Sequence, residues 1–402
     1  MINLELPKRL QDLHTLIHAV AQNVLRPISR KYDVQEHAVP EELNALDRRR
    51  GRAAGGGGRE GGAKGAKKLD VTDATSVRNA GNMESIVSVT EMSWGDVGLM
   101  LSIPGGGLGN AAINAAGTPE QREKFGGYYA SMAITEPGSG SDSGSITTTA
   151  RLDGDAWVLN GEKIFVTAGG RSDAVVVWAN VDKAKGKAAI KSFVVPKGTP
   201  GMEVVKLEHK LGIRASDTAT IVFTDCRVPL DHVLGGAGVQ EGDKRAAFGK
   251  VMQTFDNTRP VVAAMALGVA RAALDLTYEL LGHQPVLDRP LQELTASEAA
   301  LVEMEADWEA ARLLVLRSAW MADNGQPNSM EASMGKAKAG RVGNDVTLRC
   351  VELCGSLGYS QETLLEKFAR DSKIIDIFEG TQQIQQLIVA RRLLNKSSKE
   401  LK

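Results

Sequence analysis

The sequence predicts an α+β protein that has helices at both ends and an antiparallel β domain between them. Hydrophobic residues recur at helical spacing at both ends of the chain and lie in short β-branched segments in the middle. Separate runs of helices and strands indicate separate domains and not a parallel βαβ sheet. The 402 residues suffice for three domains, so we predict an N-terminal helical domain over 1–130, a β-barrel-like domain over 131–235 and a C-terminal helical domain over 236–402.

The N-terminal domain begins with a helical pattern and then changes composition abruptly. Leu10, Leu13 and Ile17 recur at intervals of three or four residues, which predicts helix in the first 45 residues. Residues 48–68 contain eight glycines and eight Lys or Arg, with no side chain larger than Ala that could enter a core. We predict a flexible, solvated insert there. Alternatively, these residues form a basic arm that binds anionic ligands, or they do not belong to the natural sequence.

Further helices are predicted between this insert and the β domain. A helical pattern spans 82–103, the glycine-rich segment 104–109 interrupts it, and another helix follows to about Ala116. Thr118 and Pro119 have the residue types of an N-cap and a first helical position, so they predict a short helix.

The central domain contains short strands bounded by turn residues. Segments 156–159 and 163–167 flank Asn160-Gly161, a dipeptide that favours tight turns, so this stretch predicts a β-hairpin. Further strands are predicted by their β-branched residues at 175–179, 191–195, 202–207 and 220–224.

Long helices return after about residue 246. Apolar residues at helical spacing predict them at 261–281, 294–323, 329–357 and over a last stretch that ends at 394.

Composition excludes several classes of protein. A formal net charge of -1 provides no basic surface for nucleic acid, and no run of 18 apolar residues predicts a membrane span. Residues 1–10 lack the apolar region of a secretory signal. Three cysteines, Cys226, Cys350 and Cys354, are too few for a disulfide scaffold, so we predict a reducing, cytoplasmic compartment. The last two have the character of small buried hydrophobic residues.

Common motifs of cofactor and metal binding are missing. Gly138, Gly140 and Gly144 do not have the dinucleotide-binding spacing, and no G-x-S-x-G motif occurs. His14 and His18 lie four residues apart on one predicted helix face, but no third ligand is suggested nearby. We therefore interpret them as packing or surface histidines and predict no metal site.

Two segments combine residue types that suit a ligand site. Residues 135–142 carry hydroxyls and small residues that allow a ligand close to the backbone, although an ordinary turn has the same composition. In the segment 255–260, Arg259 either pairs with Asp256 or meets an anionic or polar ligand.

A third segment carries a candidate catalytic carboxylate. Residues 370–381 place Glu379 between Phe378 and Gly380. A buried carboxylate has a raised pKa and can act as a general base, whereas an exposed one would be an ordinary surface residue.

Taken together, these segments resemble the sequence motifs of acyl-CoA dehydrogenases. Residues 132–142 resemble the first family signature, 159–167 a flavin-facing hairpin, and 370–390 the second signature, with 207–234 continuing the match. The resemblance covers roughly residues 70–394. It implies a helical domain, a β domain and a C-terminal four-helix bundle, with FAD bound between the β domain and the bundle.

The resemblance also implies roles for individual residues. Glu379 takes the position of the catalytic base, and its backbone N–H polarises the thioester carbonyl together with a ribityl hydroxyl of FAD. Some family members place the base at the position of Thr258, which cannot act as one. The expected contacts of FAD are Met132, Ile134, Thr135, Gly140, Ser141, Phe165 (where a tryptophan is common in the family), Thr167, Thr381 and Gln383. The expected contacts of the acyl-CoA are Ser141, Phe255, Asp256, Arg259, Phe378 and Gly380.

Two departures from the family pattern affect the half of the FAD site that a neighbouring subunit shares. The family's Arg-x-x-Phe pair is absent at 283–288, and Glu352 stands where the family has a glutamine that contacts the neighbour's FAD. A carboxylate near a diphosphate is unfavourable. We expect a homo- or hetero-tetramer, and we hypothesise that a paralogous subunit supplies the diphosphate-binding half.

The implied activity is the FAD-dependent α,β-dehydrogenation of an acyl-CoA thioester to the trans-2-enoyl-CoA, in fatty acid β-oxidation. The expected partner is electron-transfer flavoprotein. The alternatives are an acyl-CoA oxidase on the same scaffold and a non-catalytic assembly subunit of a heteromeric acyl-CoA dehydrogenase.

Overall fold

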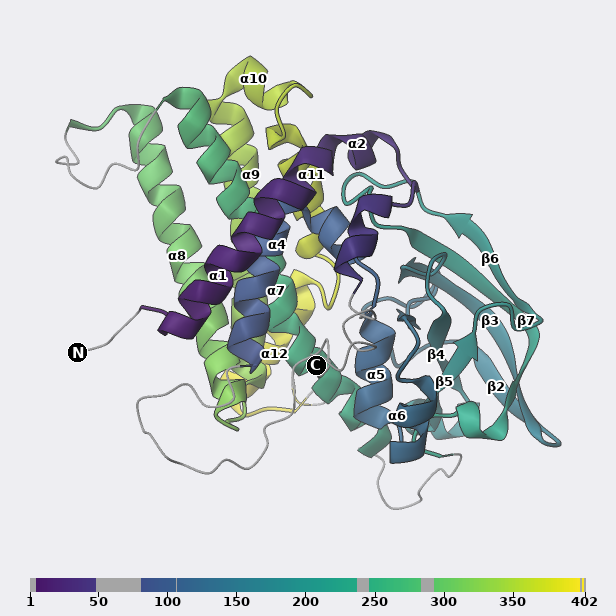
Figure 1. Cartoon of the computed structure of the whole chain (residues 1–402). Coiled ribbons are helices and arrows are strands. Elements are labelled where there is room, and N and C mark those ends of the chain that lie inside the picture. Colours follow the sequence, from purple (N-terminus) through teal and green to yellow (C-terminus); the bar gives the residue numbers. More distant parts are fainter. Residues whose placement is uncertain are drawn as a thin grey trace.

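The computed structural model describes residues 5–47, 81–105, 107–236, 246–282, 293–397 and 400, with the backbone alone for 246–257. The predicted insert at 48–68 and the departure at 283–288 lie outside these residues. Figure 1 shows most helices on one side of the molecule and the sheet on the other. This arrangement confirms the predicted α+β class and the order of helices, strands and helices, while the domain boundaries after residues 130 and 235 stay predictions.

The N-terminal helices follow the predicted pattern. They are α1 (Lys8–Val20), a π-helical turn (Ala21–Leu25), a 3₁₀ turn (Arg26–Ile28), α2 (Ser29–Val34), a 3₁₀ helix (Glu41–Leu46), α4 (Gly81–Ser102), α5 (Leu108–Ala116) and α6 (Pro119–Phe125). The predicted cap of α6 is confirmed, because the Gln121 N–H donates to Thr118 Oγ1 at 3.2 Å and the Thr118 N–H donates to Gln121 Oε1 at 3.0 Å.

The central domain is one twisted sheet. Its strands are β1 (Ala130–Ala133), β2 (Thr149–Asp153), β3 (Ala156–Thr167), β4 (Ala174–Asn180), β5 (Ile190–Pro196), β6 (Met202–Leu207) and β7 (Thr218–Pro229). The strand order is β1-β4-β2-β3-β7-β6, with β5 also paired to β4. Pairing is antiparallel as predicted, except that β1 runs parallel to β4 and Thr149 of β2 forms one parallel pair with Asn180.

The predicted hairpin at Asn160-Gly161 is wrong. Strand β3 runs through both residues, and the turn lies at Gly154-Asp155, between β2 and β3. Gly161 instead marks an irregularity in the pairing with β7. Its φ is +150°, and a Cβ there would lie 2.4 Å from Thr148 Oγ1. The close approach of the chain at Thr148, and not a turn, therefore requires glycine at this position.

The C-terminal domain consists of α7 (Ala246–Leu281), α8 (Ala296–Asp323), α9 (Ser329–Leu353), α10 (Gly355–Tyr359), α11 (Leu365–Ile375) and α12 (Gln382–Leu394). Helix α7 packs against α4, α8 and α9 (Figure 1). Its segment Thr258–Leu281 is the one described helix that is long and apolar enough to cross a membrane, and 78% of its apolar window is buried inside the protein. Burial at the centre of the helical core accounts for this composition.

Lys367 of α11 joins three parts of the molecule. Its side chain is 2% exposed, and its Nζ lies 2.8 Å from Asp96 Oδ2, at the kink of α4, and also contacts Asp371 Oδ2. Asp371 Oδ1 in turn accepts a hydrogen bond from the Ile213 N–H of the β domain at 2.5 Å. Burial alone would lower the pKa of Lys367, but Asp371 and Asp96 outweigh it and hold that pKa above its usual value. The lysine is therefore charged and fully compensated.

Replacing this lysine tests how much the connection contributes to stability. Lys367→Met leaves two buried carboxylates without their cation, so we expect the free energy of unfolding to fall by about 3–5 kcal/mol. Lys373→Met lies on the same helix at an exposed position and should change it by less than about 0.5 kcal/mol. Urea unfolding followed by tryptophan fluorescence measures both, and equal losses for the two variants would contradict this role.

Candidate active site

Glu379 lies in a tight turn between α11 and α12. Asp376 directly follows α11, and Thr381 directly precedes α12. Glu379 has φ +56° and Gly380 has φ +96°, so both residues are in the left-handed region. A non-glycine residue in that region is strained by about 1–3 kcal/mol, and such strain concentrates at functional sites. The turn directs the Glu379 side chain toward α7.

The Glu379 carboxylate is enclosed by polar groups. The residue keeps some exposed surface, but its carboxylate is densely surrounded by protein, and Thr258 Oγ1 donates a hydrogen bond to Oε2 at 2.8 Å. Burial raises the pKa of Glu379, whereas the Thr258 hydrogen bond and the charges of Arg259 and Lys336 act in the opposite direction without cancelling the rise. This carboxylate is therefore suited to accept a proton as a general base.

Thr258 has a role that sequence analysis missed. It cannot act as a base, but its hydroxyl is the direct partner of the carboxylate. The side chain is 6% exposed and lies two residues before Pro260, which interrupts the hydrogen-bond ladder inside α7. The available signal was its match to the alternative base position, because a residue there must reach the same reacting atoms.

The other predicted substrate contacts fall in two groups. Arg259 is 5% exposed and close enough to Glu379 for its charge to act on the carboxylate, and Phe378 packs partly buried against the helical core. Phe255 and Asp256 lie on α7 where the structure describes the backbone alone, so the predicted alternatives for the partner of Arg259 lie outside the described side chains.

A second part of the site is the turn at 135–142. The backbone N–H groups of Glu136 and Ser139 each donate to the other residue's carbonyl at 3.0 Å. The Glu136 carboxylate accepts hydrogen bonds from the backbone N–H and hydroxyl groups of Thr147 and Thr148 at 2.6–2.9 Å. It also lies 2.8 Å from Lys163 Nζ, with both side chains almost fully buried. Glu136, to which sequence analysis gave no separate role, therefore anchors this turn.

The Glu136–Lys163 pair is ionised inside the β domain. Burial alone would raise the pKa of Glu136, but Lys163, Thr148 and Thr147 lower that pKa to about 2. Burial lowers the pKa of Lys163 to about 8, and Glu136 partly offsets this effect. Each charge is satisfied by its partner, so the pair fixes the turn on β3.

Predicted FAD contacts from β1 and β3 lie side by side. The Ile164 N–H donates to the Thr135 carbonyl at 2.9 Å, and Lys163 Nζ donates to the Ile134 carbonyl at 3.0 Å. Met132 is half-buried on β1, two residues before Ile134.

Phe165, the next residue of β3, is exposed. Its side chain is 60% exposed, its φ is +56°, and it lies in an irregularity of β3 between Lys163 and Val166. Thr167, half-buried, follows it on the same strand, and Ser141 is exposed in the neighbouring turn. A Cβ at Gly140 would have one neighbour, Thr135 Cγ2 at 4.0 Å, so the space above the turn is open. An exposed aromatic ring on a residue with left-handed backbone is suited to a flat aromatic ligand.

The remaining predicted contacts lie at the start of α12. Thr381 precedes this helix without a side-chain cap, and Gln383 is exposed on its first turn. Within the described part of the chain, no hydrogen bond or ion pair joins the Glu379 turn to the 135–142 turn. The bond between Asp371 and Ile213 connects α11 to the β domain instead.

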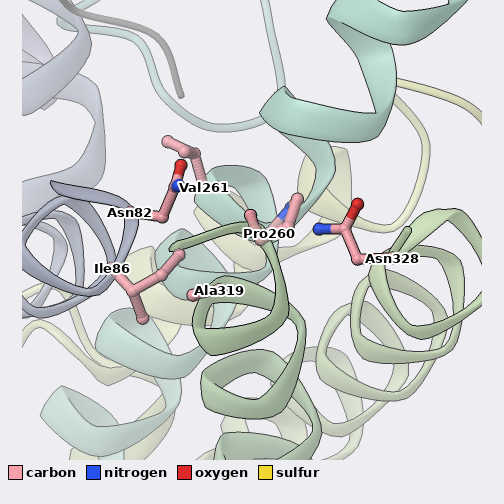
Figure 2. A pocket seen from close by; sticks show the side chains of 7 residues that line it. Asn82, Ile86, Pro260, Val261, Ala319 and Asn328 are labelled. Carbon is pink, nitrogen blue, oxygen red and sulfur yellow. The ribbon is translucent and has the colours of Figure 1, made fainter. Parts of the chain in front are cut away.

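A small cavity lies against Pro260 and Val261 of α7. It is about 10 Å³ in volume, which is room for about one water molecule. Figure 2 shows side chains from α4, α7 and α8 around it. The lining residues are Asn82, Ile86, Pro260, Val261, Ala319, Ala322 and Asn328. It is too small for an acyl chain.

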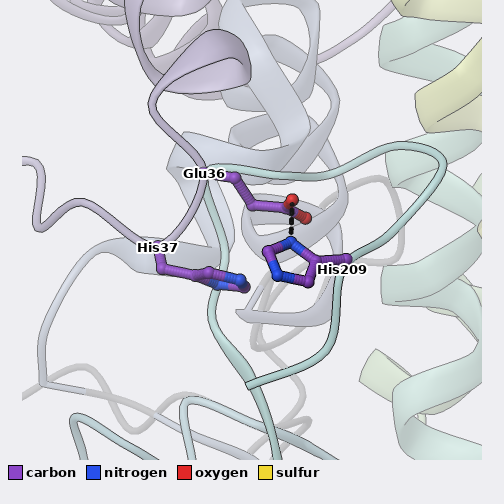
Figure 3. A group of neighbouring side chains, drawn as sticks. All are labelled: Glu36, His37 and His209. Carbon is purple, nitrogen blue, oxygen red and sulfur yellow. Dashed lines mark hydrogen bonds and ion pairs between the residues drawn. The ribbon is translucent and has the colours of Figure 1, made fainter. Parts of the chain in front are cut away.

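One group among the described residues has ligand atoms close enough for a metal ion. Glu36, His37 and His209 place these atoms within 4.8 Å of one another (Figure 3). Glu36 already bonds His209 Nδ1 at 2.8 Å and the Lys210 N–H at 2.9 Å. These bonds tie the segment after α2 to the loop after β6, so the group has a structural role without an ion.

The expectation that no third group lies near His14 and His18 is wrong. Glu91 of α4 lies between them, with its carboxylate oxygens 3.2 Å from His14 Nε2 and 2.7 Å from His18 Nδ1. These contacts hold α1 on α4, which supports the interpretation as packing histidines.

Comparisons with known proteins identify the same regions. Residues 131–226 match the family model "Acyl-CoA dehydrogenase, middle domain", and residues 248–394 match "Acyl-CoA dehydrogenase, C-terminal domain". The mitochondrial short-chain specific acyl-CoA dehydrogenase of Bos taurus is 34% identical over 401 residues, which cover 98% of this chain and 92% of that protein. The structure of butyryl-CoA dehydrogenase from Megasphaera elsdenii is 30% identical, with a TM-score of 0.81, and covers 98% of this chain and 100% of that one. A chain solved in work on the electron transferring flavoprotein of Acidaminococcus fermentans is 30% identical, with a TM-score of 0.82 and the same coverage.

The anchor of the 135–142 turn gives a stability prediction with a defined pH dependence. The folded-state pKa of Glu136, about 2, lies below its usual value of 4.5, so the ionised carboxylate stabilises the fold above about pH 4.5 and this contribution is lost as pH falls toward 2. Glu136→Gln should lower the free energy of unfolding by about 3 kcal/mol at pH 7 and by less than half of that at pH 3.

The control is Glu162→Gln, an exposed carboxylate on β3, which should change the free energy of unfolding little at either pH. Denaturant unfolding at both pH values measures the difference. A Glu136→Gln loss that is the same at pH 7 and pH 3 would show that the charge is not what anchors the turn.

Proposed function

Because the chain belongs to the acyl-CoA dehydrogenase family, we propose that it oxidises an acyl-CoA thioester to the trans-2-enoyl-CoA, with FAD as its cofactor and Glu379 as its base. The observation that carries this proposal is the enclosed Glu379 carboxylate in its left-handed turn, bonded to Thr258 at 2.8 Å. A carboxylate with a raised pKa beside the hydroxyl of Thr258 suits the removal of an α-proton.

The backbone beside the base supports polarisation of the substrate carbonyl. In the described part of the chain, no acceptor is found for the Glu379 N–H, so it is available to a thioester oxygen. A hydrogen bond there stabilises the negative charge that develops when the α-proton leaves. Glu379 then holds this proton on its carboxylate. Bound FAD would supply the acceptor for the hydride that leaves Cβ.

The described residues fit a flavin. Phe165 offers an exposed aromatic face, Gly140 leaves open space above the 135–142 turn, and half-buried Thr135 and Thr167 supply hydroxyls in the same two segments. Across the domain junction, Thr381 carries a hydroxyl that does not cap α12. These residues would hold the flavin ring and the ribityl group attached to it.

The substrate class and the partner follow from the relatives. The names of two relatives reported above refer to short-chain acyl-CoA and to butyryl-CoA. Butyryl-CoA is therefore the first substrate to test. Electron-transfer flavoprotein is the proposed electron acceptor, supported by the similar chain solved in work on such a protein. The buried, free state of Cys226, Cys350 and Cys354 agrees with a cytoplasmic, reducing environment.

We further propose that the active assembly is a hetero-tetramer. Glu352 is exposed on α9, where the resemblance places a contact with a neighbour's FAD. Leu348, Leu357 and Tyr359 expose 60%, 46% and 83% of their surface close to it in the sequence, which favours a subunit interface at this end of the bundle. A paralogous subunit that lacks this carboxylate would supply the diphosphate-binding half.

Flavin reduction tests the proposed activity. Purified holoprotein mixed anaerobically with butyryl-CoA should lose its flavin absorbance, and Glu379→Gln should slow this loss by at least about 100-fold because the base is removed. Glu362→Gln removes an exposed carboxylate ahead of α11 and should behave as the unaltered protein. Bleaching by Glu379→Gln at the unaltered rate would rule out this base.

The pH profile tests the contact between Thr258 and Glu379. The hydroxyl favours the ionised carboxylate, so Thr258→Val should raise the pKa of Glu379 further. The base must be deprotonated to react, and the acidic limb of kcat/KM should therefore move to higher pH. Steady-state rates between pH 5 and 9 measure the limb, with Thr277→Val, a buried threonine elsewhere on α7, as the control. A shift to lower pH would contradict the direction of this hydrogen bond.

Assembly tests the shared site. The chain expressed alone should retain little FAD, and co-expression with a paralogous subunit should give a complex of higher mass with FAD bound. Glu352→Gln should improve FAD retention by the chain alone, since it removes the negative charge. Native mass spectrometry and flavin absorbance measure both properties. A homotetramer of this chain with a full complement of FAD would contradict the hetero-tetramer.

A further inference from the structure

A buried lysine of α9 contacts the turn that carries the base. Lys336 has a fully buried side chain, 0% exposed, and its Nζ donates a hydrogen bond to the Gly380 carbonyl at 2.7 Å. We infer that Lys336 is a positioning residue: by holding this carbonyl it keeps the Glu379–Gly380 turn in the left-handed conformation that presents the carboxylate to the substrate. This inference rests on the proposed function of Glu379 as a base.

The turn needs external support because two successive residues are left-handed. A short loop between two helices does not by itself favour this conformation, so contacts from outside must hold it. Gln385 of α12 supplies a second set of contacts. Its Nε2 donates hydrogen bonds to the Glu379 carbonyl at 3.1 Å and to the Gly380 carbonyl at 3.0 Å. A Cβ at Gly380 would lie 2.5 Å from this Nε2, so the approach depends on glycine. The Gly380 carbonyl thus accepts from both neighbouring helices.

Helix α9 provides a rigid base for this contact. One residue after Lys336, the Ala337 carbonyl accepts a hydrogen bond from Gln382 Nε2 at 2.7 Å, and the same Nε2 also contacts Asp376 Oδ1. A Cβ at Gly340 would lie 3.2 Å from Asp376 Oδ1, so α9 and the end of α11 are closely packed. The segment that contains Glu379 is therefore attached to α9 on both sides of the turn.

The charges around Lys336 show why a lysine is tolerated at this depth. Asp376 and Glu379 favour its charged form, Arg259 of α7 opposes it, and Arg341 on α9 lies 3.8 Å from Asp376. Gln382 and Gln385 of α12 are uncharged. Burial is the largest effect and lowers the pKa of Lys336 to about 8. A charged donor makes the stronger hydrogen bond to a carbonyl, so the hold on Gly380 weakens as pH rises through this range.

Replacement of the lysine by a side chain of similar length tests the inference. Lys336→Met removes the N–H donor and the charge. With the holoprotein and butyryl-CoA, we expect kcat to fall about 10- to 100-fold, because small misplacements of a catalytic group have effects of this size, while KM changes less than about threefold. Lys338→Met is the matched control, since Lys338 lies two residues away on α9 and pairs with Asp307 at 2.6 Å. It should leave kcat and KM unchanged.

A readout that does not depend on turnover separates the inference from the proposed function. Hydrogen–deuterium exchange of a peptide covering 376–385 should accelerate in Lys336→Met and not in Lys338→Met. If the unaltered protein oxidises no acyl-CoA but exchange still accelerates in Lys336→Met, the proposed function is wrong. The role of Lys336 in fixing the turn is then still supported. Unchanged exchange in Lys336→Met, or an unchanged kcat in an active protein, would overturn the inference.

The unaltered protein provides a second test should Lys336→Met not fold. We expect kcat to decline above about pH 8, and we expect the protection of 376–385, measured relative to the intrinsic exchange rate at each pH, to fall over the same range. A kcat that stays level to pH 10, with no change in this protection, would overturn the inference.

Discussion

The contact of Lys367 with Asp96 and Asp371 is the interaction on which the arrangement of the site depends. It joins the kink of α4 to α11, and the second oxygen of Asp371 continues the connection to Ile213 of the β domain. A buried charge is costly unless it is fully paired, so α4, α11 and the 208–217 loop have little freedom to move apart. The Glu379 turn directly follows α11 and is placed by this connection.

The two halves of the site are each held by a buried lysine. Lys163 fixes the 135–142 turn through Glu136, and Lys336 reaches the carbonyl of Gly380. In both cases the lysine contacts the backbone or carboxylate of a turn that carries residues proposed to meet a ligand. Phe165 and Glu379 are the two positions at which a non-glycine residue in the left-handed region carries a proposed function. Strain at these positions is supported by the surrounding ion pairs and hydrogen bonds.

Sequence patterns predicted the elements that depend on local chemistry. The cap of α6 at Thr118, helix α4 and the order of the domains follow from residue types that act within a few positions of one another. The prediction of a hairpin at Asn160-Gly161 was wrong because glycine is required there by the close approach of Thr148, which lies outside the local sequence pattern. The contact of Thr258 with Glu379 spans 121 residues, so no local pattern encodes it. The burial of Lys336 likewise becomes visible only once α9, α11 and α12 are packed together.

Proton removal from the substrate is the central claim, and exchange at the α-carbon measures it without requiring hydride transfer to be complete. The holoprotein and its Glu379→Gln variant can be incubated with butyryl-CoA in D₂O under anaerobic conditions, and the recovered thioester analysed by mass spectrometry. The account predicts that the unaltered protein introduces deuterium at the α-carbon and that Glu379→Gln does not. Equal deuterium incorporation by both proteins would contradict the assignment of Glu379 as the base.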